Sequence, residues 1–256
     1  MRRDGWIAFR TLAIKEFLRF IRIWVQTVLP PVVTTALYFI IFGELIGERL
    51  GPVHGHDYMT WLVPGLVMLA VITNAYANVV SSFFSAKFHR HIEELLVAPV
   101  PNFLILAGYV AGGVARGLVV GLAVLATAAV FSAVPFAHPG IALLVWLLTC
   151  VLFSLAGLIN GIYARTFDDI SIVPTFVLTP LTYLGGIFYS IDMLPPFWKQ
   201  LSLGNPILYI INSFRYGMLG VTDVGLWTGF AVIAAFILVL TAWALWLLEH
   251  SSALRH

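Results

Sequence analysis

The chain has 256 residues, of which 61% are hydrophobic and only 10% are charged, and its mean hydropathy is +0.97. Soluble domains carry about 25% charged residues, so this composition excludes a water-soluble globular protein and predicts that lipid covers most of the surface. A net charge of +2 gives no reason to expect a nucleic-acid partner. The single cysteine, Cys150, lies in an apolar run and provides neither a disulfide nor a thiolate metal site.

Residues 1–24 predict an amphipathic helix that lies in the membrane interface. Aromatic and small side chains recur at every third or fourth position, and basic side chains fall on the opposite face. We expect the first face to meet lipid tails and the basic face to meet head groups, although an ordinary solvated helix is the alternative. The first face carries Trp6, Phe9, Ala13, Phe17 and Phe20, and the second carries Lys15, Arg19 and Arg22.

The rest of the chain contains apolar segments near the ~20 residues that cross a bilayer. We predict six spans, at residues 25–46, 58–84, 103–134, 141–163, 170–189 and 226–248. The fold class is therefore an all-α integral membrane protein, with residues 1–256 forming a single transmembrane domain. Basic residues concentrate on the side of the N-terminus, so the positive-inside rule places both termini in the cytoplasm.

Glycines recur every fourth residue in the third and fourth predicted spans, a spacing that lets two helix backbones approach closely. We expect these faces to pack against other helices. The glycines are Gly113, Gly117 and Gly121 in one span and Gly157 and Gly161 in the other.

A few polar residues near or within the spans are candidates for function. A charge such as Arg116 costs at least ~2.5 kcal/mol inside a membrane unless it is paired or hydrated, so this residue faces the pore, an acidic group of a second subunit, or a polar pocket between helices. Asn74 and Asn78 lie one turn apart, and we expect them to form a hydrogen-bonded helix contact. The loop His54-Gly55-His56-Asp57 offers too few ligands for a closed metal site, so we expect no metal there.

Residues 85–102 are the most densely charged run between two apolar segments, and they predict one short helix. Arg90 lies three and four residues before Glu93 and Glu94, so we expect the three side chains to share a face. A two-faced cytoplasmic helix can pass a mechanical signal to a soluble partner, but a solvated loop explains the same charges. Lys87 adds a further charge. The apolar face consists of Ile92, Leu95 and Leu96. We expect Pro99 and Pro101 to end the helix.

Residues 190–225 are apolar but are interrupted by Lys199, the Asn205-Pro206 break and Arg215. We predict two short helices that enter the outer leaflet and return, because non-helical backbone at that depth needs protein or water around it. The alternative is a seventh span ending near Gly220, which would place the C-terminus outside.

These features, in this order, resemble the membrane subunit of ABC type-2 transporters, with most likeness to the YadH-like branch. The resemblance covers nearly the whole chain and implies half of a pore in a bacterial inner-membrane exporter, with a second permease copy and two cytoplasmic ATPase subunits. It implies an ATPase-coupling helix at Lys87–Pro99, which includes Leu96, and re-entrant helices at Asp192–Gly220. It rests on the basic first helix, on Ile92–Pro99, on Met193-Leu194-Pro195, on Asn205–Tyr209 and on Arg215.

The chain contains no Gly-x-x-x-x-Gly-Lys-Ser/Thr motif, so we expect it to bind no ATP, Mg²⁺ or other cofactor and to rely on a separate ATPase. An intramembrane lipid-modifying enzyme or protease is one alternative, but His-Glu-x-x-His and Gly-x-Ser-x-Gly are both absent from the sequence. A passive membrane scaffold or sensor is the other. Substrates in the family include drugs, lipids and polysaccharides, and the residues do not choose among them.

Overall fold

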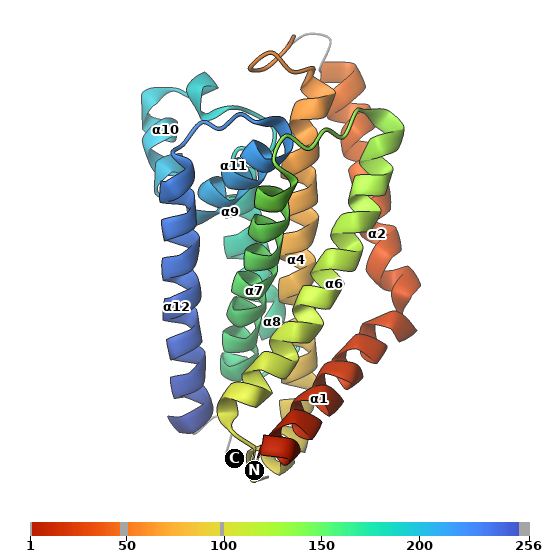
Figure 1. Cartoon of the computed structure of the whole chain (residues 1–256), viewed down its shortest axis with the longest axis vertical. Helices are drawn as coiled ribbons and strands as arrows, with labels where there is room; N and C mark the ends of the chain where they lie inside the picture. The colour runs from red at the N-terminus through yellow and green to blue at the C-terminus, as the bar shows by residue number, and fades with distance from the viewer. Residues whose placement is uncertain (1, 47–50, 98–99, 251–256) are drawn as a thin grey trace.

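The computed structural model describes residues 2–46, 51–97 and 100–250, and within these ranges the regular elements are helices (Figure 1). The predicted all-α class is therefore confirmed. In chain order the elements are α1 Arg2–Arg22, α2 Trp24–Tyr38, the π-helix η1 Phe39–Ile46, α4 Tyr58–Phe88, α5 His91–Val97, α6 Asn102–Phe131, α7 Pro139–Tyr163, α8 Asp169–Val173, the π-helix η2 Pro174–Leu178, α9 Thr179–Tyr183, the 3-10 helix η3 Ile191–Met193, α10 Pro196–Leu203, α11 Pro206–Leu219 and α12 Leu226–His250.

Five helical stretches in the described part of the chain are long and apolar enough to cross a membrane. They correspond to five of the six predicted spans. They are Trp24–Gly43, Tyr58–Phe88, Asn102–Phe131, Pro139–Tyr163 and Leu226–His250.

The span predicted at residues 170–189 is not seen at full length. Three consecutive five-residue segments, α8, η2 and α9, carry the helix only from Asp169 to Tyr183. At ~1.5 Å per residue this is roughly 22 Å, short of the ~30 Å hydrocarbon core. The helix ends where Gly185 and Gly186 follow, and Gly186 has a φ of +78°, which a side chain would disfavour.

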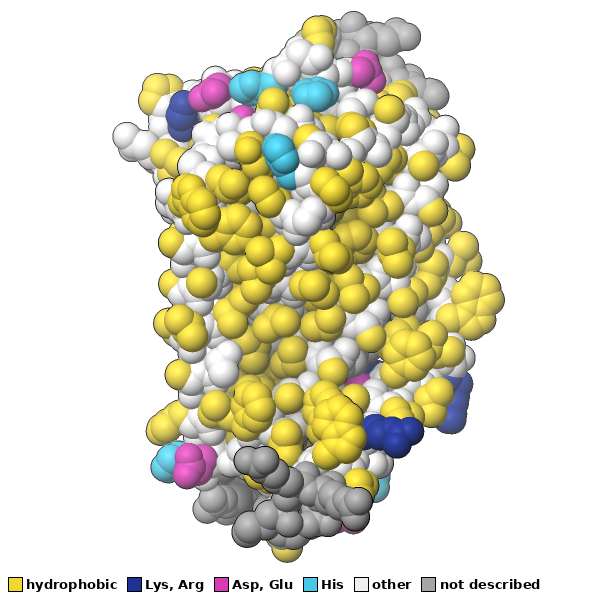
Figure 2. Space-filling model, in the orientation of Figure 1, with side chains coloured by type: hydrophobic (Ala, Val, Ile, Leu, Met, Phe, Trp, Pro, Cys, Tyr) yellow, Lys and Arg dark blue, Asp and Glu magenta, His cyan; other side chains and the backbone are white. Residues whose placement is uncertain are grey.

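Helix α4 is the centre of the bundle. In its most apolar stretch 83% of the residues are buried, compared with 17% for the first span and 22% for the last. It packs mainly between α7 and α6, and α12 lies on the outside (Figure 1). Apolar side chains cover the middle of the visible surface, and charged and histidine side chains gather towards its two ends (Figure 2).

The two ends of the molecule differ in what they carry. The first residues of α1, the last residues of α12 and the short helix α5 lie together at one end (Figure 1). Helices α10 and α11 lie towards the opposite end, together with the loops that precede α4 and α7. This arrangement places α5, the start of α1 and the end of α12 at the same end of the bundle.

The predicted packing glycines lie where helices meet. A Cβ atom on Gly157 of α7 would be 2.6 Å from the backbone oxygen of Tyr76 in α4, and one on Gly117 of α6 would be 2.6 Å from Cys150 Sγ. Van der Waals contact between such atoms needs at least about 3.4 Å. The remaining three have these neighbours: Gly113 meets Ser154 and Val79, Gly121 meets Trp146 and Val71, and Gly161 meets Phe83.

Gly157→Ala is expected to destabilise the bundle by about 1–3 kcal/mol, the usual cost of overpacking, because the atom in its way belongs to the backbone and cannot rotate aside. Thermal unfolding of the detergent-purified protein measures this as a lower melting temperature. Gly140→Ala is the matched control, since the space around Gly140 at the start of α7 is open. Equal melting temperatures for the two variants would contradict the close approach of α4 and α7.

Candidate functional site

The charged run at residues 85–102 forms two helices instead of the one predicted. Helix α4 continues to Phe88, and α5 begins at His91. Between them Arg90 adopts a φ of +62°, a left-handed conformation that ends a helix. Arg90 therefore lies in a turn and does not share a helix face with Glu93 and Glu94, which corrects the prediction.

Lys87 belongs to α4 and turns away from α5. Its Nζ donates hydrogen bonds to the backbone oxygens of Ile162 and Ala164, the latter at 2.8 Å. These carbonyls lie at the C-terminal end of α7, where helical partners run out and a cation is favourable. Lys87 thus joins the ends of two spans. Of the other predicted coupling residues, Pro99 and the side chain of Leu96 lie outside the described part of the chain.

Helix α5 is anchored by its apolar side, whereas Glu94 and the C-terminal residue of the helix are exposed. Ile92 is buried in a cluster with Leu12 of α1 and Ile105 of α6. The side chain of Val97 is 86% exposed, and Glu94 is also exposed. Such a helix presents a surface while remaining fixed to the bundle.

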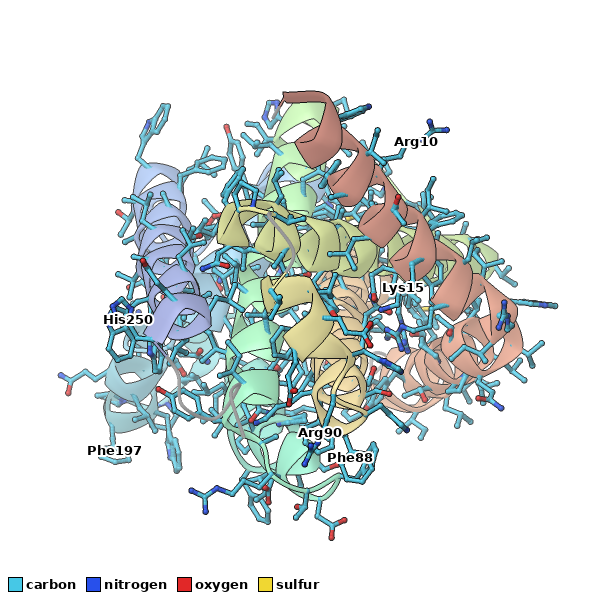
Figure 3. All side chains as sticks on the ribbon, turned by 90° about the horizontal axis from the view of Figure 1, so that it is seen from below. Arg10, Lys15, Phe88, Arg90, Phe197 and His250 are labelled. Carbon is cyan, nitrogen blue, oxygen red and sulfur yellow. The ribbon has the colours of Figure 1, made fainter. Side chains whose placement is uncertain are left out.

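A groove of about 350 Å³ separates α5 from α1 and the start of α6. Glu94 of α5 and Lys15 of α1 both line it, so its rim carries opposite charges. Seen from below, Lys15 and Arg10 project from α1 and Arg90 from the α4–α5 turn (Figure 3). The other lining residues are Ala8, Thr11, Leu12, His91, Leu95, Val100, Leu104 and Ile105.

The short turn between α7 and α8 borders the same end. The Asp169 carboxylate accepts hydrogen bonds from the backbone N–H groups of Arg165, at 2.7 Å, and Thr166, at 3.0 Å. These bonds hold the pKa of the Asp169 carboxyl below its usual range. Phe167 packs on Phe84 of α4 with ring centroids 4.9 Å apart, so the turn is fixed against the end of α4.

Helix α1 is tied to α4 by a buried polar network that the sequence pattern did not reveal. Glu16 is fully buried and accepts a 2.6 Å hydrogen bond from Ser82 Oγ. Arg19 Nη2 donates to Asn78 O at 2.7 Å and to Asn78 Oδ1 at 2.8 Å, and Arg19 Nε lies 3.4 Å from Glu16 Oε2. Arg19 therefore points into the protein. The prediction that it faces lipid head groups is wrong.

The predicted aromatic face of α1 is split between lipid and protein. Trp6 is 63% exposed, and its ring centroid lies 5.6 Å from that of Phe9. Phe17 is also exposed. Phe20, in contrast, is buried. On the basic side Arg22 is exposed, whereas the Nζ atom of the half-exposed Lys15 lies 3.7 Å from Glu16 Oε1.

Arg116 opens into a polar groove of about 450 Å³ that runs along α2, α4 and α9. Its Nε and Nη2 donate to Asn74 Oδ1 at 3.2 and 3.1 Å. Across the groove the hydroxyls of Tyr38 in α2 and Tyr183 in α9 are hydrogen bonded at 2.6 Å. The groove is also lined by these polar residues: Gln26, Thr27, Thr34, Thr35, Thr73 and Thr179.

At the opposite end the chain breaks at Asn205-Pro206, between α10 and α11. The Asn205 side chain caps α11 by accepting from the Ile207 N–H at 3.0 Å, and Pro206 fills the first helical position. Helix α11 has 14 residues and ends at Leu219, so it is too short to be the alternative seventh span. Arg215 is fully buried, lies 4.0 Å over the Trp61 ring and donates to Gly186 O at 2.6 Å.

Arg19→Ala is expected to lower the melting temperature clearly, because it leaves the Glu16 carboxylate buried without its guanidinium. Breaking a buried pair costs about 3–5 kcal/mol, and the loss here is smaller because Arg19 is 30% exposed. Arg22→Ala, one turn further along the same helix and exposed, is the control. A melting temperature equal to that of the control would show that the network contributes nothing.

Comparison with known proteins places this architecture. The family model described as "ABC-2 type transporter" matches residues 7–219. The "Inner membrane transport permease YadH" of Escherichia coli strain K12 is 62% identical over 244 residues, covering 94% of each chain. "Nodulation protein J" of Rhizobium leguminosarum bv. viciae is 22% identical over 226 residues, covering 88% of this chain and 87% of that protein. The chain belongs to the ABC-2 type transporter family.

Proposed function

We propose that the chain is the membrane-spanning permease subunit of an ATP-binding-cassette exporter. It forms half of a translocation path and is driven by a separate ATPase, which binds the ATP and Mg²⁺. The observation that carries this proposal is α5, a short acidic helix fixed to the bundle beside a charged groove at the end that holds both termini. Family membership and the printed name of the Escherichia coli permease support the same function.

The coupling step follows from how α5 is held. Only His89 and Arg90 separate α5 from α4, so a displacement of α5 must pull the end of α4. Lys87 joins that end to α7, and Arg19 joins α4 to α1. When ATP closes the motor dimer, the pull on α5 therefore moves these helices together as a rigid body, which is the general form of alternating access.

The polar groove is the part of the chain best suited to line the path. A guanidinium and several hydroxyl groups at membrane depth need water or protein as neighbours. The stretch that contains α2 is the least buried of the candidate spans. Phe176 of η2, the segment that precedes α9 in the chain, is 73% exposed. We infer that a second copy of the permease covers this face, giving a homodimer with two ATPase subunits.

The proposed location is the inner membrane, with both termini and α5 in the cytoplasm. The chain's one cysteine is buried, so Cys150→Ala gives a clean background for labelling. In that background Val97→Cys in α5 is expected to react with a membrane-impermeant maleimide only after spheroplasts are permeabilised. Phe197→Cys in α10, whose parent side chain is 69% exposed, is expected to react in intact spheroplasts.

Val67→Cys, at a fully buried position in α4, is the control and should stay unlabelled until the protein is denatured. Labelling of Val97→Cys from outside intact spheroplasts would reverse the proposed topology and remove α5 from the reach of any cytoplasmic ATPase.

The double variant Glu93→Ala/Glu94→Ala tests the coupling site. We expect association with a co-expressed cassette ATPase to weaken at least about tenfold, or ~1.4 kcal/mol, because the acidic rim of the groove is lost. The melting temperature should stay unchanged, since Glu94 is exposed and neither carboxylate makes a hydrogen bond described for this helix.

Asp168→Ala, an exposed acidic residue at the same end but outside the groove, is the control. Co-purification and ATP-driven efflux at the wild-type level in the double variant would show that the motor grips another surface.

A further inference from the structure

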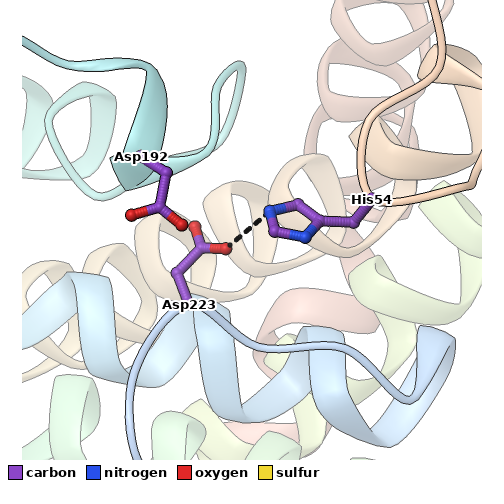
Figure 4. Close-up of side chains that lie close together, drawn as sticks. All are labelled: His54, Asp192 and Asp223. Atoms are coloured by element: carbon purple, nitrogen blue, oxygen red, sulfur yellow. Dashed lines mark ion pairs between the residues drawn. The ribbon is translucent and has the colours of Figure 1, made fainter.

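Three side chains from three separate loops meet at the end of the molecule opposite α5 (Figure 4). His54 precedes α4, Asp192 lies in η3, and Asp223 lies between α11 and α12. One ligand atom from each lies within 4.8 Å of the other two. The sequence drew attention to the loop that contains His54 but predicted no metal there, because the two aspartates are far from it in the chain.

Asp223 is the fixed member of the group. Its side chain is only 1% exposed. Oδ2 accepts a 2.9 Å hydrogen bond from the Ile191 N–H, and the Asp223 N–H donates to Asn212 Oδ1 at 3.0 Å. Oδ1 accepts no hydrogen bond among the described residues, and its neighbour is the His54 Nε2 atom at 3.3 Å, the ion pair marked in Figure 4. A cation shared with that imidazole would satisfy this buried oxygen.

His54 is also held in place. Its ring stacks on Trp61 with centroids 5.3 Å apart, and its Nε2 lies 3.3 Å from Asp223 Oδ1 and 3.1 Å from Ser190 Oγ. Two ligands of a tetrahedral zinc ion, each at about 2.0–2.2 Å, stand roughly 3.3–3.5 Å apart. The nitrogen and the carboxylate oxygen already have this separation.

Asp192 is the adjustable member. Its side chain is 60% exposed, and Lys199 Nζ holds only Oδ1, at 2.7 Å. The second carboxylate oxygen is free to turn towards the other two ligands, and water can complete a fourth position. Without a metal, Lys199 and Ser190 are the neighbours of Asp192 and His54.

We propose that His54, Asp192 and Asp223 bind one divalent transition-metal ion of the zinc type. An imidazole with two carboxylates suits zinc better than Mg²⁺ or Ca²⁺, which prefer oxygen ligands alone. The ion ties the loop before α4, the segment containing η3 and the loop after α11 to one another. The ion thereby holds together the loops that pack around α11, and this role does not require an ATPase.

The test uses the full chain, purified in detergent without a histidine tag and stripped with EDTA. We expect isothermal titration with Zn²⁺ to give one ion per chain, and Co²⁺ to give the visible absorption of a tetrahedral site. His54→Ala and Asp192→Asn should bind at least about tenfold more weakly, since removing a group that merely orients a ligand already costs roughly 10–100-fold. Zn²⁺ should also raise the melting temperature of the wild-type protein but not that of His54→Ala or Asp192→Asn.

His56→Ala is the matched control, because His56 lies in the same loop as His54 but outside the cluster. It should bind Zn²⁺ like the wild-type protein. The proposal is wrong if the wild-type protein shows no saturable binding, or if His54→Ala and His56→Ala bind equally. Asp223→Asn is left out of the test because Asp223 also holds the Ile191 backbone. No transport or ATPase activity is measured, so the result is separate from the proposed function.

Discussion

Polar side chains of α4 hold the bundle together. In a membrane a buried arginine must find an acceptor, because lipid offers none. Asn78 accepts from Arg19 of α1, and Asn74 accepts from Arg116 of α6. Towards the end opposite α5, the guanidinium of Arg215 in α11 lies over the Trp61 ring of α4. Helices α1, α6 and α11 are thus each attached to the same helix by an arginine.

Much of the fold follows from apolar length alone, and the differences have specific physical causes. The predicted helix at residues 85–102 fails at Arg90, since a left-handed arginine is set by tertiary packing and leaves no mark in charge spacing. The span at 170–189 is shortened because Pro174 and Pro180 interrupt the regular hydrogen bonds and Gly186 permits a reversal. Apolar composition continues through these residues, so hydropathy alone extended the helix too far.

The site residues were harder to predict than the spans. A periodic pattern assigned Arg19 to the lipid head groups, because it ignored Glu16, whose carboxylate makes the inward orientation favourable. The asparagines of α4 were recognised as a helix contact, but their arginine partners lie more than 40 residues away in sequence. The meeting of His54 with Asp192 and Asp223 depends on three loop conformations, so local motif spacing carried no information about it.

The polar groove is the basis for our proposal that two copies of this chain act together. Helix α2, with only 17% of its span buried, forms one wall, and the groove contains Arg116 and a row of threonines. Arg116 already donates to Asn74, and Thr27, Thr73 and Thr179 donate to backbone oxygens of the preceding turn. Lipid tails offer nothing to the hydrogen-bonding capacity that remains, whereas water or another protein surface would. A second copy related by a twofold axis would bring the same polar wall to face its equivalent. We infer that the two walls enclose the path, while the more apolar face around α12 remains in contact with lipid.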